Sequence, residues 1–278
     1  MNIAFFGTPD RAVYVLDELK AAGILPSLII TQPDRPQGRK LVLTPPPVKT
    51  WAQKEKIEVL QPDDLSDTGF IKRLKNGGFD AFVVVAYGKI LKDEILDIPT
   101  RGSLNLHASL LPKLRGSCPI ETAILQDEKN TGVSIIKMDK FMDHGPIIAS
   151  KEVVPSRWPL PADDLARELV TEGGKLFAQV LPQWIAGKIE ANEQDHDAAT
   201  FTKKITKEDG LIDLGADGYQ NFLKWNAYKG WPGSYFFTKS NKRVVITDAG
   251  FVDGIFKILK VVPEGRKEIS WEDFSKNV

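Results

Sequence analysis

Three side chains that can together catalyse acyl transfer occur in one stretch of the chain. Asn105 and His107 lie two positions apart where polar and apolar residues alternate, and this alternation predicts a β-strand over 103–107. Because alternate residues of a strand share a face, the amide and the imidazole are expected side by side. Asp143 follows a second predicted strand over 131–138. That order can bring its carboxylate beside the imidazole at one end of a sheet.

An amide, an imidazole and a carboxylate suit the transfer of an acyl group to an amine. The carbonyl becomes a tetrahedral oxyanion, and protons move from the attacking amine to the leaving group. His107 can shuttle protons, Asn105 can donate an N–H to the oxyanion, and Asp143 can orient the imidazole. No covalent nucleophile is required. The same residues are also compatible with a hydrogen-bonded strand pair of no catalytic meaning, so the pattern alone leaves both interpretations open.

Two further chemistries have weaker support in the sequence. Cys118 is the only cysteine, and no base stands at a recognisable spacing from it. A small buried cysteine is commonly a packing residue. His144 can bind a metal together with Asp143, but a zinc site needs more ligands than the chain visibly gathers. We therefore expect neither thiol nor metal catalysis.

The segments that must position these residues predict an α/β fold. Apolar runs at 2–6, 28–30 and 80–85 have the composition of strands buried on both faces. Strands of this kind that alternate with helices indicate a doubly wound, mainly parallel sheet, with ligands at the carboxyl ends of the strands. Further elements are predicted as helices over 48–56, 70–74 and 119–126 and a short strand over 59–60.

A basic, proline-rich loop interrupts this pattern. The prolines and the glycine within residues 32–47 predict that this segment lacks regular structure. A loop this long inside a compact domain is usually functional or disordered. It carries Arg35, Arg39 and Lys40, and these cations are candidates for contact with an anionic partner.

The remainder of the chain predicts a long helix, a linker and a small β domain. An apolar stripe from Pro161 indicates a helix packed across the sheet, with irregularities at Gly173–Gly174 and Pro182. Residues 187–208 are polar, and we expect His196 to be exposed there. Alternating runs near 234–237, 243–247 and 256–262 predict a small β-barrel or sandwich. The expected parts are a catalytic domain over 1–186, a linker over 187–208 and a small domain over 209–278.

The composition of the chain argues against several classes of protein. The chain has 278 residues with 37 basic and 37 acidic side chains, which argues against binding nucleic acid over the whole surface but leaves local basic patches possible. One cysteine excludes an internal disulfide and fits a reducing compartment. No segment approaches the ~18 apolar residues of a membrane span, and no basic leader precedes the first apolar run. We expect a cytoplasmic protein without membrane contact.

Motifs around the three candidate residues resemble the signature of the formyltransferases that use 10-formyltetrahydrofolate. Asn105, His107 and Asp143 match that signature one by one. The core motifs do not name the acceptor, because the superfamily includes methionyl-tRNA, glycinamide ribonucleotide and sugar-amine formyltransferases and a formyltetrahydrofolate dehydrogenase domain. The matching motifs are Asn105-Leu-His107, Ser109-Leu-Leu-Pro112, Arg115-Gly116 and Met142-Asp143-His144-Gly145-Pro146-Ile147.

Other motifs resemble the methionyl-tRNA branch of this superfamily, almost from end to end. Three places depart from the pattern: Ser117–Cys118 replaces the usual pair of alanines, His144 stands where threonine is common, and Lys140–Phe141 replaces a more usual polar-glycine pair. The C-terminal domain is also short for the branch. The resembling motifs are Phe6-Gly7-Thr8-Pro9, Pro33-Asp34-Arg35-Pro36 with Gly38-Arg39, Pro47-Val48-Lys49, residues 204–213 and Trp231-Pro232-Gly233.

The resemblance implies a fold, an activity and a set of site residues. The fold is a Rossmann-like catalytic domain, a linker and an OB-like β-barrel. The activity is transfer of a formyl group from 10-formyltetrahydrofolate to the α-amino group of methionine on initiator methionyl-tRNA, by direct attack of the amine and without a metal, and we expect a monomer. The residues implied are Ser109, Leu110, Leu111, Pro112, Gly88, Lys89, Ile90, Leu91 and Asp139 for the folate donor, and Arg35, Arg39 and Lys40 for the tRNA.

Two alternative functions stay open at this point. An amino-sugar nucleotide N-formyltransferase would use the same donor and the same three catalytic residues. The basic loop and the small second domain favour tRNA, because each phosphate contact needs a placed cation whereas a nucleotide sugar needs a compact pocket. A non-catalytic RNA-binding protein of OB type is the other alternative. The presence of all three catalytic residue types argues against it.

Overall fold

The structure, a computed structural model, describes residues 1–38 and 41–276 and divides into two compact units. The three expected parts, 1–186, 187–208 and 209–278, stay a prediction. The first unit comprises Met1–Arg115, Gly132–Val153 and Arg167–Phe201, and the second comprises Gly116–Thr131, Val154–Ala166 and Thr202–Val278.

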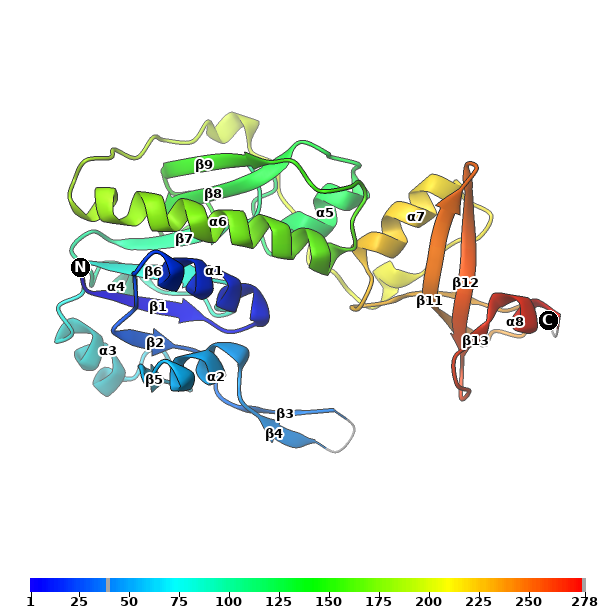
Figure 1. The fold of residues 1–278 in the computed structure, drawn as a ribbon, viewed down its shortest axis with the longest axis horizontal. Coiled ribbons are helices and arrows are strands. Elements are labelled where there is room, and N and C mark those ends of the chain that lie inside the picture. The colour runs from blue at the N-terminus through cyan, green and yellow to red at the C-terminus, as the bar shows by residue number, and fades with distance from the viewer. Residues whose placement is uncertain (39–40, 277–278) are drawn as a thin grey trace. The chain divides into compact units, whose positions relative to one another are not determined.

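A seven-stranded sheet forms the centre of the first unit (Figure 1). Its strand order is β5-β2-β1-β6-β7-β8-β9, and β5, β2, β1, β6 and β7 run parallel whereas β8 is antiparallel to β7. The doubly wound, mainly parallel α/β sheet expected from the sequence is therefore confirmed. Its strands are β1 Ile3–Gly7, β2 Leu28–Ile30, β5 Glu58–Leu60, β6 Ala81–Val85, β7 Ser103–His107, β8 Thr131–Lys137 and β9 Ile147–Val153.

The order in which successive strands are added to the sheet changes direction between β1 and β6. From β1 it proceeds outward to β2 and β5, and it then returns to β6 on the other side of β1. Such a switch point opens a crevice at the carboxyl ends of the two strands. Here Thr8 Oγ1 donates a hydrogen bond of 2.9 Å to the Tyr87 carbonyl, which joins the segments that follow β1 and β6.

The strand register decides which face of the sheet carries the polar residues of β7. Val83 pairs with Leu104 and Val84 pairs with Asn105, so each pair projects to the same face. Val84 belongs to the apolar cluster that α3 (Thr68–Lys75) and α4 (Asp93–Leu96) cover. Asn105 and His107 therefore lie on the face of α3 and α4, while Leu104 and Leu106 face the opposite side.

Helix α6, Ala162–Ile185, lies on that opposite side of the sheet and is continuous (Figure 1). The prediction of irregularities at Gly173–Gly174 and Pro182 is therefore wrong. A Cβ on Gly173 would stand 2.6 Å from Leu106 Cδ2, and one on Gly174 would stand 2.9 Å from Glu18 Cβ. The two glycines thus let the helix approach β7 and α1 (Asp10–Ala21) closely, where packing compensates for their poor helix propensity.

The basic loop is more ordered than its composition predicts. A two-stranded antiparallel hairpin forms from β3 (Arg35–Gln37) and β4 (Val42–Thr44), so the expectation that 32–47 lacks regular structure is wrong. Pro36 is compatible with this hairpin because an isolated two-stranded ribbon has edges where a missing N–H costs no ladder bond. Arg39 and Lys40 lie outside the described residues.

The second unit contains the predicted C-terminal β domain. Its four antiparallel strands have the order β10-β11-β12-β13, and among residues 202–276 no pairing joins β13 back to β10. Val244, Ile246, Val261 and Phe236 form its buried core with Trp225 of α7. Its strands are β10 Ser234–Phe237, β11 Arg243–Val252, β12 Ile255–Pro263 and β13 Ile269–Ser270; the remaining helices are α2 Pro47–Lys54, α5 Pro119–Leu125, α7 Gly218–Ala227 and α8 Trp271–Ser275, with 3-10 turns at His196–Ala198 and Glu208–Gly210.

Candidate active site

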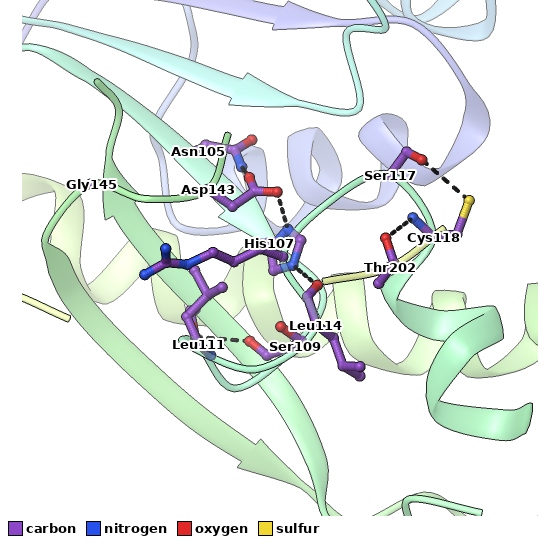
Figure 2. Close-up of polar contacts among 12 residues, drawn as sticks. Asn105, His107, Ser109, Leu111, Leu114, Ser117, Cys118, Asp143, Gly145 and Thr202 are labelled. Carbon is purple, nitrogen blue, oxygen red and sulfur yellow. Dashed lines mark hydrogen bonds and ion pairs between the residues drawn. The ribbon is translucent and has the colours of Figure 1, made fainter. Parts of the chain in front are cut away.

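The structure brings the three candidate catalytic side chains together (Figure 2). Asn105 Nδ2 lies 3.4 Å from Asp143 Oδ1, and His107 Nδ1 lies 3.5 Å from Asp143 Oδ2. The His107 side chain is nearly enclosed, and the Asp143 carboxylate is 14% exposed. Both distances are long for strong hydrogen bonds, which leaves the carboxylate and the imidazole able to tighten around a substrate.

The second nitrogen of His107 fixes the orientation of its ring. Nε2 lies 2.9 Å from the Leu114 carbonyl, which can only accept, so Nε2 carries a proton. Nδ1 is then the nitrogen that faces Asp143 and Asn105, and it is the one available to exchange a proton in the site. Leu114 itself has a left-handed backbone with φ of 58°, and its N–H donates to Thr200 Oγ1 at 2.8 Å.

Asp143 reaches the imidazole across the face of β7 rather than beyond the strand's end. Because β8 is antiparallel to β7, the loop after β8 starts beside the first residue of β7, where the Met138 N–H donates to the Ser103 carbonyl. Asp143 adopts a left-handed φ of 49° in this loop. A Cβ at Gly145 would overlap the Lys137 carbonyl oxygen, so the loop folds back tightly on the end of β8.

The turn over 109–112, expected to bind the donor, follows directly from β7. Ser109 Oγ donates to the Lys113 carbonyl at 2.6 Å, which closes the turn. Ser134 of β8 accepts from the Leu111 N–H at 3.0 Å and donates to the Ser109 carbonyl at 2.8 Å. The turn is therefore anchored to the neighbouring strand through a single buried hydroxyl. Leu110 and Pro112 are half-buried.

The segment 88–91 follows the adjacent parallel strand β6, so it starts at the same sheet edge as that turn. Gly88 has a positive φ of 81°, and the preceding Tyr87 carbonyl also accepts from Gln32 Nε2 at 2.8 Å. Lys89 Nζ donates to the carbonyls of Pro62 and Asp63. Ile90 is 81% exposed whereas Leu91 is buried in the core, so Ile90 presents an apolar side chain to solvent.

Two titratable groups at this edge have shifted pKa values. Burial raises the pKa of Tyr87 to about 12, and its hydroxyl has no hydrogen-bond partner within residues 1–38 and 41–276. The hydrogen bond from Lys49 lowers the pKa of Asp34 below its usual value, and Gln61 adds to this effect. Asp34 thereby stays ionised at the base of the β3–β4 hairpin and holds Lys49 against it.

Of the three residues expected to contact tRNA, the structure describes only Arg35. Arg35 is exposed and its Nη2 donates to Gln32 Oε1 at 2.7 Å. The crevice beside it has a volume of about 440 Å³ and is lined by Thr8, Gln32, Arg35 and the prolines that follow β4. Arg39 and Lys40 lie outside the described residues, so their role stays a prediction.

Asp139 and His144 are hydrogen-bonded on either side of Asp143 in the same loop. His144 Nδ1 lies 2.6 Å from Asp139 Oδ2, and its ring stacks on His196 with centroids 4.0 Å apart. His196 is exposed as expected, but it also contacts Arg115 Nη2 at 2.9 Å through Nδ1. Within residues 1–38 and 41–276, no group of three or more His, Cys, Asp or Glu side chains is arranged to hold a metal.

Sequence reasoning missed two buried polar residues of the site. Gln194 Nε2 donates to the carbonyls of Asp143 and Gly145 at 2.9 and 2.7 Å, and Gln194 Oε1 accepts from Arg115. In the sequence, Arg115 stands out only as part of the Arg115-Gly116 motif, and Gln194 lies in the polar stretch predicted to be a linker. A glutamine among polar residues carries no signal of burial, so only the tertiary structure reveals it.

Cys118 has no base among its hydrogen-bond partners. Its N–H donates to Thr202 Oγ1 at 3.2 Å, and its sulfur lies 3.4 Å from Ser117 Oγ (Figure 2). A thiolate nucleophile needs a neighbouring imidazole, cation or similar activating group. These contacts offer none.

Comparison of the sequence with known protein families identifies its family. The formyl transferase family matches residues 1–181, and the chain belongs to that family. The matched residues include the candidate amide, imidazole and carboxylate of Asn105, His107 and Asp143.

Within the family, the chain is similar to the methionyl-tRNA formyltransferase of Chloroflexus aggregans, with 42% identity over 92% of this chain and 84% of the relative. Two solved structures share its fold at lower identity. A sugar N-formyltransferase from a Shewanella species has a TM-score of 0.68 and 14% identity, covering 91% of this chain and 98% of its own. A methionyl-tRNA formyltransferase from Clostridium thermocellum has a TM-score of 0.63 and 15% identity, covering 97% and 99%. None of the helices in the described part of the chain is long and apolar enough to cross a membrane.

Proposed function

We propose that this enzyme transfers the formyl group of 10-formyltetrahydrofolate to the α-amino group of methionine on initiator methionyl-tRNA. The observation that carries the choice of acceptor is the 42% identity to a methionyl-tRNA formyltransferase over 92% of the chain, an extent that must reach into the C-terminal β domain. Fold alone does not discriminate, because a sugar N-formyltransferase and a methionyl-tRNA formyltransferase have similar TM-scores to this structure.

The chemistry follows from the three side chains. The amine nitrogen attacks the formyl carbon, a C–N bond forms, and the carbonyl oxygen becomes an oxyanion that Asn105 Nδ2 stabilises. The amine gives up a proton to His107 Nδ1, the nitrogen that does not contact the Leu114 carbonyl. The bond between the formyl carbon and N10 of the folate then breaks, and N10 receives that proton from His107. Asp143 orients the imidazole and stabilises its positive charge.

The donor is assigned to the anchored backbone near β6, β7 and β8. The proposed contacts are the turn Ser109–Pro112, the segment Gly88–Leu91 and the loop that starts at Asp139. The turn and the segment begin at the ends of adjacent parallel strands. Met138, immediately before the loop, packs against the same core cluster as Leu91. These elements are held by hydrogen bonds that Ser109, Ser134, Lys89 and Gln32 donate to backbone carbonyls, which favours binding of a rigid bicyclic ring with little reorganisation.

The acceptor is assigned to the hairpin of β3 and β4. Arg35 stands at its base, Arg39 and Lys40 belong to the same basic stretch, and Leu41, Val42 and Leu43 are more than half exposed. Cations beside exposed apolar side chains suit a nucleic-acid surface, where phosphates meet the charges and sugars or bases meet the apolar groups. We further propose that the protein is a cytoplasmic monomer with a catalytic domain over 1–186, a linker over 187–208 and a small OB-like domain over 209–278.

One assay tests the proposed activity directly. The purified protein is incubated with 10-formyltetrahydrofolate and charged initiator tRNA, with amino-sugar nucleotides as competing acceptors. Formylation of the methionyl-tRNA, without inhibition by the sugars, is the expected result. Preferential formylation of an amino-sugar nucleotide would establish the alternative acceptor, and no transfer to either would reject both.

A further inference from the structure

One extended segment of the first unit contacts both loops that carry the proposed catalytic side chains. Asn192 exchanges two backbone hydrogen bonds with Ile147, at 2.7 and 2.8 Å, immediately after the Asp143 loop. At its other end, the Thr200 carbonyl accepts from the Arg115 N–H at 2.8 Å, and Thr200 Oγ1 accepts from the Leu114 N–H. Residues 192–200 thus join the loop of Asp143 to the residue whose carbonyl holds His107.

Gln194 lies midway along this segment, and its whole side chain is used. It is 5% exposed, and Arg115 is 3% exposed. Its amide nitrogen has two protons, and they bond the carbonyls of Asp143 and Gly145. Its amide oxygen accepts from both Nε and Nη2 of Arg115 at 3.1 and 2.7 Å. A buried amide with all these bonds made is rigid, because losing any one leaves a buried polar group unpaired.

The backbone that Gln194 holds has little stability of its own. Asp143 has a left-handed φ of 49°, a conformation that is unfavourable for a residue with a Cβ. Gly145 packs against the Lys137 carbonyl so closely that no side chain fits. The two carbonyls that flank this turn receive their side-chain donors from Gln194. The direction of the Asp143 carboxylate toward His107 therefore depends on a residue in the polar segment.

We propose that Gln194, braced by Arg115, is a positioning residue that fixes Asp143 against His107 during formyl transfer. This inference rests on the proposed roles of Asp143 and His107. Gln194 contacts no reacting group; it acts through the backbone of Asp143 and Gly145. Its loss lowers the rate of the chemical step and leaves binding of the folate donor largely intact.

Two substitutions separate this role from a merely structural one. Gln194→Glu keeps an oxygen for Arg115 and adds an opposite charge to it, so the scaffold contact is retained. It places a carboxylate against two carbonyl oxygens, however, and removes both donors to the Asp143 turn. Gln194→Met has similar length and removes donors and acceptor without adding charge. Gln183→Glu, on the exposed surface of α6, is the matched control for the change in charge.

The measurement is single-turnover formyl transfer at saturating donor and methionyl-tRNA, together with KM for the donor. A single-turnover rate constant refers to active molecules only, so a partly unfolded preparation does not change it. We expect Gln194→Glu and Gln194→Met to lower the rate constant by about 10- to 100-fold, since small misplacements of a catalytic group cost that much. KM for the donor should change by less than about 3-fold, and Gln183→Glu should match the wild type.

A double variant tests whether Gln194 acts through Asp143. If it does, Gln194→Glu should add less than about 2-fold to the loss already caused by Asp143→Asn, because coupled residues are non-additive. Wild-type rates in both Gln194 variants, or a double variant whose loss is the product of the two single losses, would overturn the inference. A normal rate in Asp143→Asn alone would instead reject the proposed role of Asp143.

Discussion

At the scale of single residues, the arrangement assigns one task to each polar group around His107. Asp143 faces Nδ1, the Leu114 carbonyl accepts from Nε2, and Asn105 stands on the same strand face. We expect Asn105→Ala and Asp143→Asn each to lower turnover by at least about 100-fold with the fold intact, because removing one oxyanion donor or one orienting carboxylate typically costs that much. Single-turnover kinetics with circular dichroism as the folding control check this. Near-normal rates in either variant would contradict its assigned role.

Cys118 gives the matching negative prediction. Its partners are the Thr202 and Ser117 hydroxyls, and no step of formyl transfer to an amine needs a thiolate. Cys118→Ala should therefore leave turnover within about 2-fold of the wild type, since only a small packing change is involved. Steady-state rates before and after treatment with a thiol-specific alkylating reagent provide the check. A large loss of turnover in a well-folded variant would restore thiol catalysis as an explanation.

At the scale of elements, the β3–β4 hairpin contains none of the residues proposed to hold the donor. Arg39 belongs to this basic stretch, and we expect it to contact phosphate or base edges of the tRNA. Losing a charged contact costs roughly 1.5–3 kcal/mol, so Arg39→Ala should lower kcat/KM for charged tRNA by about 10- to 150-fold. Hydrolysis of the formyl donor without tRNA should hardly change.

Both rates are measured on one preparation across a salt series, with Lys54→Ala at the end of α2 as the charge-matched control. Because released counterions drive phosphate contacts, the wild type should lose kcat/KM with salt more steeply than Arg39→Ala. Equal losses in tRNA formylation and donor hydrolysis, or no loss in either, would show that the hairpin takes no part in tRNA recognition.

At the scale of the whole molecule, three tyrosines with raised pKa values lower the stability at alkaline pH. Burial raises the pKa of Tyr87 and Tyr228 to about 12, and partial burial together with the hydrogen bond to Asp127 raises the pKa of Tyr219 to about 12, from the usual value of 10.0. A group whose pKa is raised on folding stabilises fully below the unfolded value and loses that effect as pH rises through the folded value. The free energy of unfolding should therefore fall between pH 10 and pH 12.

Tyr87→Phe and Tyr219→Phe separate the contributions in urea titrations at pH 8 and pH 11. The Tyr87 hydroxyl is buried without a partner, so its removal should cost little at pH 8 and should make the alkaline loss smaller. Tyr219 donates to Asp127 at 2.9 Å, so Tyr219→Phe should cost about 0.5–1.5 kcal/mol at pH 8. Equal pH dependence in Tyr87→Phe and the wild type would show that Tyr87 does not contribute.

The amino-acid sequence by itself determined much of the order of elements and the residue types of the candidate site. Apolar runs such as 80–85 indicate a strand buried on both faces, and the two-residue spacing of Asn105 and His107 puts their side chains on one face. Both properties depend on neighbouring residues alone, so local patterns suffice. The local patterns did not predict β9, α4, α8 or the β3–β4 hairpin, and they wrongly predicted an irregularity at the two glycines of α6. At these places contacts with distant residues override local propensity.

Only the tertiary structure decided how the site is held together. Leu114, Gln194 and Arg115 are unremarkable in sequence, and Gln194 lies 51 residues from the Asp143 carbonyl that it holds. A buried hydrogen bond between such distant positions is set by the packing of the whole sheet and its loops, and no local periodicity records it. Sequence therefore identified the candidate catalytic groups, whereas the fold alone shows which residues contact the loops that carry them.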